Sequence, residues 1–268
     1  MDIITILGYA AAILIGVSLG LIGGGGSILT VPVLVYILHI DPVLATAYSL
    51  FVVGTTSLVG AGNYMKSGLV DYKTAVVFAI PSFIAVFLTR KFLVPWLPDP
   101  LFSMGDVAIS KSVGIMVFFA LIMLAASYSM IKEKKKGGED ENGEVKFNIP
   151  LIALEGSVVG VITGIVGAGG GFLIIPALVL LARLPMKLAV GTSLLIIAAK
   201  SLIGFLGDIS TQTIDWQMLL IFTGLSVVGI FIGSALSKKI NDKALKKGFG
   251  WFVLVMGIYI IGKELMNL

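Results

Sequence analysis

The chain has 268 residues, of which 57% are hydrophobic and 13% charged, and its formal net charge is +4. Soluble domains carry about 25% charged residues, and a soluble fold of this length could not hide so much apolar surface from water. The apolar residues come in runs of about 20, which matches a bilayer core about 30 Å thick. Alternating strands are absent, which argues against a β-barrel. We therefore expect an all-α integral membrane protein, whose basic residues set orientation and do not bind nucleic acid.

Cysteine and histidine usage limits the chemistry that the chain can perform. The absence of cysteine excludes disulfides and thiolate metal sites. His39, the only histidine, cannot build a metal site alone. We expect no metal and no cofactor. The first apolar run follows Met1-Asp2 without a basic segment, so we expect it to remain as a helix and not to be a cleaved signal peptide.

The apolar segments fall into two groups of five, separated by a polar stretch. The first group is Ile3–Ile22, Ser27–Leu38, Val43–Met65, Tyr72–Val94 and Lys111–Ile131; the second is Ile149–Val166, Phe172–Leu184, Leu188–Gly207, Trp216–Leu236 and Phe249–Leu265. The stretch between them is rich in Lys, Glu and Gly, too charged to enter lipid, and is typical of a flexible linker. We expect a first membrane repeat over 1–131, a cytoplasmic linker over 132–148 and a second membrane repeat over 149–268.

A single offset aligns the two groups. Pro32 and Pro176 are 176 − 32 = 144 positions apart, and this offset, without gaps, pairs residues that apolar helices do not share by composition alone. It pairs Gly16 with Gly160, Gly20 with Gly164, Gly23 with Gly167, Ala45 with Ala189, Ser49 with Ser193 and Asp71 with Asp215. We infer a duplication.

The second segment of each repeat is short and follows a glycine cluster, so we expect a broken helix or a re-entrant hairpin. With either structure the repeat crosses the membrane an odd number of times, so the second repeat enters in the opposite sense. Placing the linker inside also puts a group of lysines inside, namely Lys238, Lys239, Lys243, Lys246 and Lys247, whereas Arg90, Lys91 and Lys111 break the pattern. Inverted repeats are a common basis for alternating access, with the substrate site near the midplane.

The glycine clusters are candidates for an anion-binding site. Their residues are Gly23, Gly24, Gly25, Gly26 and Ser27 in the first repeat and Gly167, Gly169, Gly170 and Gly171 in the second. Glycine leaves backbone N–H groups uncovered, and non-helical backbone inside a membrane must line a cavity or be buried. The following helix start adds a partial positive charge, which favours anions. The alternative is that these glycines only allow helices to pack closely, as in Gly16-x-x-x-Gly20.

Lys200 is the second candidate. It lies 13 residues after Lys187, which is about 20 Å into the membrane at 1.5 Å per residue. A cation at this depth is costly and usually functional, although it could also extend toward the outer face. Its repeat partner is Thr56. Hydroxyl groups that could assist it are on Ser49, Thr56, Thr192 and Ser193, though such hydroxyls often only tie helices together.

Three acidic residues have simpler interpretations. Asp71 and Asp215 each precede a predicted helix, and we expect both to be N-caps. Glu155 lies near the inner end of its helix, where it could carry a coupling proton or simply face the linker.

The duplicated pattern resembles a known family. Each repeat contains a glycine cluster, a proline six residues after the last paired glycine, and a later Ala-x-x-x-Ser-Leu. The proline is Pro32 in the first repeat and Pro176 in the second, and the serine is Ser49 or Ser193. This combination resembles the TauE/SafE family of sulfite and organosulfonate exporters over nearly the whole chain. The resemblance implies transport of sulfite, sulfonates or related anions across the cytoplasmic membrane. Thiosulfate importers with cysteine relays are a different type, and the chain has no cysteine.

We therefore expect a secondary transporter for a small sulfur anion, working by alternating access. Export is favoured because an inside-negative potential drives a monoanion outward by about 2.3 kcal/mol per 100 mV. The alternatives are a carrier for another small anion or carboxylate, or a membrane assembly protein. An enzyme is not expected, because zinc-protease and serine-hydrolase motifs are absent. The expected partners are the anion and the lipid bilayer; whether the protein forms a homodimer stays open.

Overall fold

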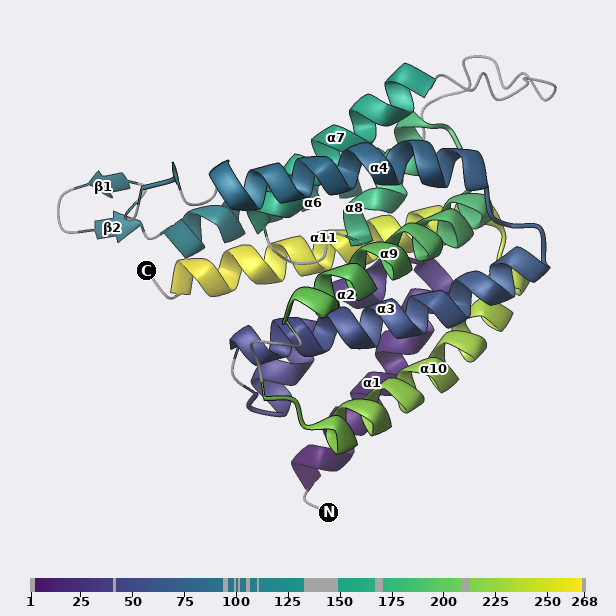
Figure 1. Ribbon diagram of the computed structural model, residues 1–268, viewed down its shortest axis with the longest axis horizontal. Coiled ribbons are helices and arrows are strands. Elements are labelled where there is room, and N and C mark those ends of the chain that lie inside the picture. The colour runs from purple at the N-terminus through teal and green to yellow at the C-terminus, as the bar shows by residue number, and fades with distance from the viewer. Residues whose placement is uncertain are drawn as a thin grey trace.

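A computed structural model describes residues 3–40, 42–93, 96–98, 100, 102–104, 107–109, 111–132, 149–166, 171–208 and 213–266. Within these ranges the chain is almost entirely helical (Figure 1). The first half contains α1 (Ile3–Ile22), α2 (Gly25–Pro32), η1 (Val33–Ile37), α3 (Pro42–Lys66), α4 (Tyr72–Leu88), η2 (Thr89–Leu93), β1 (Phe102–Met104), β2 (Val107–Ile109) and α6 (Lys111–Ile131). The second half contains α7 (Ile149–Val166), α8 (Gly171–Pro176), η3 (Ala177–Leu181), α9 (Met186–Asp208), α10 (Trp216–Lys239) and α11 (Asp242–Met266).

The predicted helical membrane fold is confirmed. Five helices of the described chain are long and apolar enough to cross a bilayer, namely α1, α3, α9, α10 and α11, and α4 and α7 are shorter apolar helices. The outward face of α4 is an apolar stripe of Val76, Ile80, Ile84 and Phe87, each more than half exposed. Their spacing of three and four residues places them on one side of the helix. Such a stripe is compatible with lipid and not with water.

The antiparallel hairpin of β1 and β2, in which Ser103 lies opposite Ala108, extends from one end of the bundle (Figure 1). We did not expect it. Its strands are three residues long, too short to produce a period-two pattern in the sequence.

Each glycine cluster is followed by a short helix, as predicted. α2 has eight residues and η1 five, and α8 and η3 have six and five. At about 1.5 Å per residue neither segment reaches across a hydrocarbon core of about 30 Å. Pro32 and Pro176, one repeat apart, end the α-helical turns, and π-helix follows in both. A proline cannot donate the i→i−4 bond, which explains the change of pitch.

The two halves pack against each other in exchanged pairs. α1 runs along α10, and their repeat equivalents α7 and α4 run along each other. In the first pair a Cβ on Gly16 would touch the Ser226 carbonyl, and in the second a Cβ on Gly160 would lie 2.5 Å from the Ser82 carbonyl. Gly16 and Gly160 are 144 positions apart, as are Ser82 and Ser226. The duplication seen in the sequence thus extends to specific backbone contacts.

Helices one repeat apart run antiparallel. Gly54 of α3 lies against Leu202 of α9, whereas Gly191, near the start of α9, lies against Tyr64, near the end of α3. Figure 1 shows the two helices side by side in the middle of the molecule. α6 and α11 are also antiparallel equivalents, because Gly250 lies against Ile131 and Gly257 against Leu124.

Candidate functional site

The first glycine cluster ends α1 and begins α2 in a tight turn. Gly23 has a φ of 74°, which glycine adopts at little cost, and its N–H donates to the Leu19 carbonyl over 2.7 Å. A Cβ on Gly23 would lie 2.5 Å from Ser193 Oγ on α9 and 2.7 Å from Ile175 Cδ1 on α8. Position 23 therefore requires glycine for two reasons: the backbone conformation of the turn and the close approach of the second half.

The beginnings of α2 and α8 meet in the interior. A Cβ on Gly171, the first residue of α8, would lie 3.0 Å from Ser27 Oγ in the first turn of α2. Ser27 and Gly171 are 144 positions apart, so equivalent points of the two repeats touch. The first N–H groups of a helix have no partner inside it. The contact brings two helix N-termini, with their partial positive charges, to one place.

Two predicted site hydroxyls lie at this place, and both already donate hydrogen bonds. Ser27 Oγ donates to the Gly24 carbonyl over 2.7 Å, and Ser193 Oγ donates to the Val190 carbonyl over 2.8 Å. Each oxygen keeps lone pairs for accepting but has no second proton to give. The Ser27 N–H also donates to the Gly24 carbonyl, over 3.3 Å. Both hydroxyls would have to rotate before they could donate to a bound anion.

The other three predicted hydroxyls, on Thr192, Thr56 and Ser49, differ in hydrogen bonding and burial. Thr192 is fully buried, and its Oγ1 accepts the backbone N–H of Asp71 over 2.9 Å. Thr56 is fully buried, and its hydroxyl has no hydrogen-bond partner among the described residues. Ser49 is 8% exposed. Among the described residues, the buried Thr56 hydroxyl therefore has no hydrogen-bond partner. Burying an unpaired hydroxyl costs about 1–3 kcal/mol of stability.

Lys200 extends to α7. Its ammonium donates to Thr163 Oγ1 over 2.9 Å, and the Thr163 hydroxyl in turn donates to the Gly160 carbonyl over 3.2 Å. Lys200 is half-buried and Thr163 is 2% exposed. The lysine stands one turn beyond Ile197, whose Cδ1 would lie 2.9 Å from a Cβ on Gly171. Lys200 therefore connects α9 to α7 within a few residues of the start of α8.

Sequence reasoning missed two residues that support this region. Thr163 holds the Lys200 ammonium; its repeat partner is Leu19, so the duplication gave no signal. Tyr64 on α3 is fully buried and donates its hydroxyl to the Gly20 carbonyl over 2.8 Å, which ties the end of α1 to α3. A tyrosine deep in an apolar segment was the available signal, because a buried phenol usually has a partner. The predicted residues Gly167, Gly169 and Gly170 lie outside the described residues.

The predicted N-caps are confirmed. Asp71 Oδ1 accepts the N–H of Thr74 at the start of α4, and Asp215 Oδ1 accepts the N–H of Met218 at the start of α10, both over 3.1 Å. Both residues therefore have structural roles. The described part of the chain holds no group of three His, Cys, Asp or Glu residues that could bind a metal.

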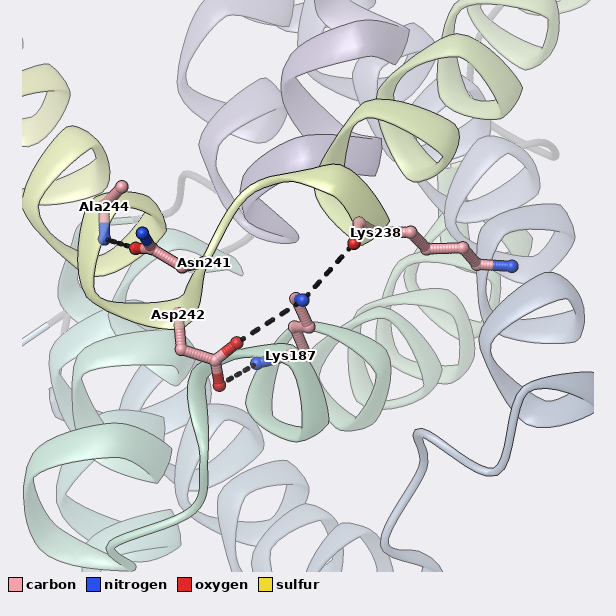
Figure 2. Close-up of polar contacts among 5 residues, drawn as sticks. All are labelled: Lys187, Lys238, Asn241, Asp242 and Ala244. Atoms are coloured by element: carbon pink, nitrogen blue, oxygen red, sulfur yellow. Dashed lines mark hydrogen bonds and ion pairs between the residues drawn. The ribbon is translucent and has the colours of Figure 1, made fainter.

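A polar cluster joins the start of α9 to the turn between α10 and α11 (Figure 2). Lys187 Nζ lies 3.8 Å from Asp242 Oδ1 and 3.5 Å from the Lys238 carbonyl, while Asn241 caps α11 by accepting the N–H of Ala244 over 2.7 Å. The side chains of Lys187 and Asp242 are 27% and 43% exposed, and pairs at the surface contribute about 0–1 kcal/mol. The cluster fixes a turn and lies apart from the glycine clusters in the sequence.

The architecture identifies the class of membrane protein, and the comparisons identify the protein family. Five helices long and apolar enough to cross a bilayer, together with two short, proline-ended helices, make this a multi-pass membrane protein. The sequence profile of the family described as Sulfite exporter TauE/SafE matches residues 8–260. The chain belongs to this family, and the predicted resemblance is confirmed.

Known relatives carry names of the same kind. The chain is 27% identical over 259 residues to a "Probable membrane transporter protein" of Xylella fastidiosa, covering 95% of this chain and 94% of that protein. It is 27% identical over 277 residues to the "Probable membrane transporter protein YunE" of Bacillus subtilis, covering 97% and 94%. A third relative, MJ0441 of Methanocaldococcus jannaschii, is 32% identical over 118 residues. No solved structure matches the chain significantly. The family match and the two Xylella and Bacillus relatives therefore support membrane transport over nearly the whole chain.

Proposed function

We propose that this protein is a secondary carrier that moves sulfite or an organosulfonate out across the cytoplasmic membrane by alternating access. The observation that carries the proposal is the meeting of two helix N-termini at Ser27 and Gly171, next to the Lys200 region. Two N-termini and an ammonium supply positive potential and N–H donors to a small oxyanion without a metal. The family description supplies the sulfur-anion substrate class.

The paired packing supports alternating access. Exchanged pairs α1–α10 and α4–α7, together with the antiparallel equivalents α3 and α9, are the contacts expected of two inverted repeats. Each pair combines one helix from each repeat, so rocking one pair against the other would open the meeting point to alternate sides. Ser27 and Ser193 are buried here, 7% and 0% exposed, so substrate exchange requires such a movement.

The test is counterflow in liposomes loaded with unlabelled sulfite. Purified protein is expected to accumulate labelled sulfite transiently, with saturation, and with competition from methanesulfonate but not from chloride. Flux without saturation or counterflow would indicate a pore. Counterflow that sulfite and sulfonates do not inhibit would exclude them as substrates, and carboxylates and other small anions would then be screened. A folded protein without flux of any small anion would favour a membrane assembly role.

Direction is tested separately with a potential. A potassium gradient with valinomycin sets the interior of the liposomes negative or positive. Electrogenic export predicts that a negative interior drives the anion out, by about tenfold in the equilibrium ratio for 60 mV. An unchanged distribution would require a coupled counter-charge.

A further inference from the structure

One buried carboxyl is unused by the proposed anion site. Glu155 on α7 is 4% exposed, and neither of its oxygens has a hydrogen-bond partner among the described residues. An ionised carboxylate buried in this way would lose its hydration without replacement, which is far more costly than burying the neutral acid. The described conformation therefore favours a Glu155 that carries a proton.

Among the side chains that the structure describes, none forms a hydrogen bond with the Glu155 carboxyl. The elements packed against α7 are α4, η2, α6, α8 and η3, and α8 and η3 contain no titratable residue. The charged or titratable residues of the others are Tyr72, Lys73, Arg90, Lys91, Lys111 and Tyr128. Tyr72 and Lys73 are exposed at the first turn of α4, and Tyr128 is exposed and bonded to Lys132 over 2.7 Å. Arg90 and Lys91 lie beyond the opposite end of α4.

Glu155 shares one face of α7 with the residue that binds Lys200. The buried stripe of this helix contains Ile152, Glu155, Val159 and Thr163, at helical spacing. Glu155 and Thr163 are eight residues apart, or about 12 Å along the axis. The Lys200 ammonium is held on Thr163 at this face. A carboxylate at Glu155 would attract this ammonium and would repel an anion bound to it.

One interhelical hydrogen bond of the α1–α10 crossing has no counterpart among the described residues of the α4–α7 crossing, which contains Glu155. In the α1–α10 crossing, Ser226 Oγ lies 3.0 Å from the Ala12 carbonyl of the other helix. The equivalent serine in the α4–α7 crossing is Ser82, which is 1% exposed, and its hydroxyl has no partner among the described residues. Position 155 corresponds to Ala11 in the first repeat. Within the described residues, the α4–α7 crossing therefore contains an acid and a serine whose buried oxygens have no partner. Separating the two helices would give Glu155 access to water.

We propose that Glu155 is the proton-binding group of this carrier, and that its protonation promotes anion binding at Lys200. This inference rests on the proposed function for its choice of ligand. Protonation removes a negative charge about 12 Å along α7 from Thr163, the residue that holds the Lys200 ammonium. For an anion at that distance, at an effective dielectric constant of 20, this corresponds to about tenfold in affinity. Because proton and anion favour the same state, they move in the same direction. Movement of one proton with one monoanion carries no net charge, so the potential experiment above would then leave the anion distribution unchanged, and an outward-acid gradient would oppose export.

The test uses methanesulfonate, which stays a monoanion between pH 6 and pH 8, so that the ligand itself does not titrate. Binding to the purified full chain is measured by calorimetry at both pH values. Wild type is expected to bind about tenfold more tightly at pH 6. Glu155→Gln is expected to bind at both pH values as wild type does at pH 6, and Glu155→Asp to keep the pH dependence. Asp242→Asn, which changes a surface carboxylate, serves as the matched control and should behave as wild type. A pH-independent wild type, or a Glu155→Gln that keeps the dependence, overturns the coupling.

A second measurement does not need the ligand. Infrared spectra of the wild-type protein in lipid at neutral pH should contain a protonated-carboxyl C=O band that Glu155→Gln lacks. If methanesulfonate and sulfite do not bind but this band is present, the substrate assignment fails and the proton site stands. If the band is absent, the proton site is wrong whatever the substrate.

Discussion

The backbone N–H of Asp71, at the start of α4, donates to the hydroxyl of Thr192 on α9 over 2.9 Å. At the equivalent place in the other half, the N–H of Asp215 donates to the Tyr48 hydroxyl over 2.7 Å. Tyr48 and Thr192 are 144 positions apart, as are the two aspartates, so one contact is built twice with different side chains. Each bond fixes the entry of α4 or α10 against the central helices α3 and α9.

Thr192→Val should destabilise the protein, because it keeps the side-chain shape and leaves the partly buried Asp71 N–H without its acceptor. The expected loss is about 1–3 kcal/mol, measured as a lower midpoint of thermal unfolding in detergent. Thr192→Ser keeps the hydroxyl and is the matched control. Equal stability of the valine and serine variants would show that water replaces the bond. Transport by Thr192→Val that is lost without loss of stability would indicate that Thr192 also contacts the anion.

Gly23→Ala should disturb the turn between α1 and α2. Alanine at a φ of 74° costs about 1–2 kcal/mol, and its Cβ would meet Ser193 Oγ, adding about 1–3 kcal/mol of overpacking. Gly62 on α3 is the control, because a Cβ there has nothing within 4 Å. Gly62→Ala should stabilise the helix by up to about 1 kcal/mol. Similar melting of both variants would contradict the close packing at Gly23.

The two serine contacts between helix pairs predict an asymmetry. Ser226 Oγ lies 3.0 Å from both the Phe222 carbonyl of its own helix and the Ala12 carbonyl of α1, so Ser226→Ala should cost about 1 kcal/mol. Ser82→Ala removes a buried hydroxyl that has no partner in the described chain, so it should be neutral or stabilising. Unfolding midpoints of the two variants, compared in one detergent, check the difference. A larger loss for Ser82→Ala would mean that its hydroxyl is used after all.

Much of this structure follows from patterns in the sequence. The bounds of α1, α6 and α7 agree with the expected segments, since runs of apolar residues define helices in lipid. The register of 144 anticipated the matched contacts of Gly16 and Gly160, because small residues mark close helix crossings. The exact pairing of α1 with α10 could not be predicted, since apolar helices carry little information about their neighbours. The Lys200–Thr163 bond was also hidden, because a single hydroxyl in an apolar helix has many candidate donors. The role of both residues in anion binding stays a prediction.

Lys200→Met tests the charge at the site while keeping the length and apolar stem of the side chain. If the ammonium attracts the anion, sulfite counterflow should fall at least tenfold, because a charge-assisted hydrogen bond contributes about 1.5–3 kcal/mol. Lys200→Arg should retain part of the activity.

Thr163→Val removes the hydroxyl that positions the ammonium, and should raise the sulfite concentration for half-maximal flux more than it lowers the maximal rate. Lys187→Met changes a basic residue of the surface cluster and should leave counterflow unchanged. If Lys200→Met, at normal expression and unfolding midpoint, transports as wild type does, Lys200 does not belong to the site. The two helix N-termini at Ser27 and Gly171 would then have to hold the anion without it.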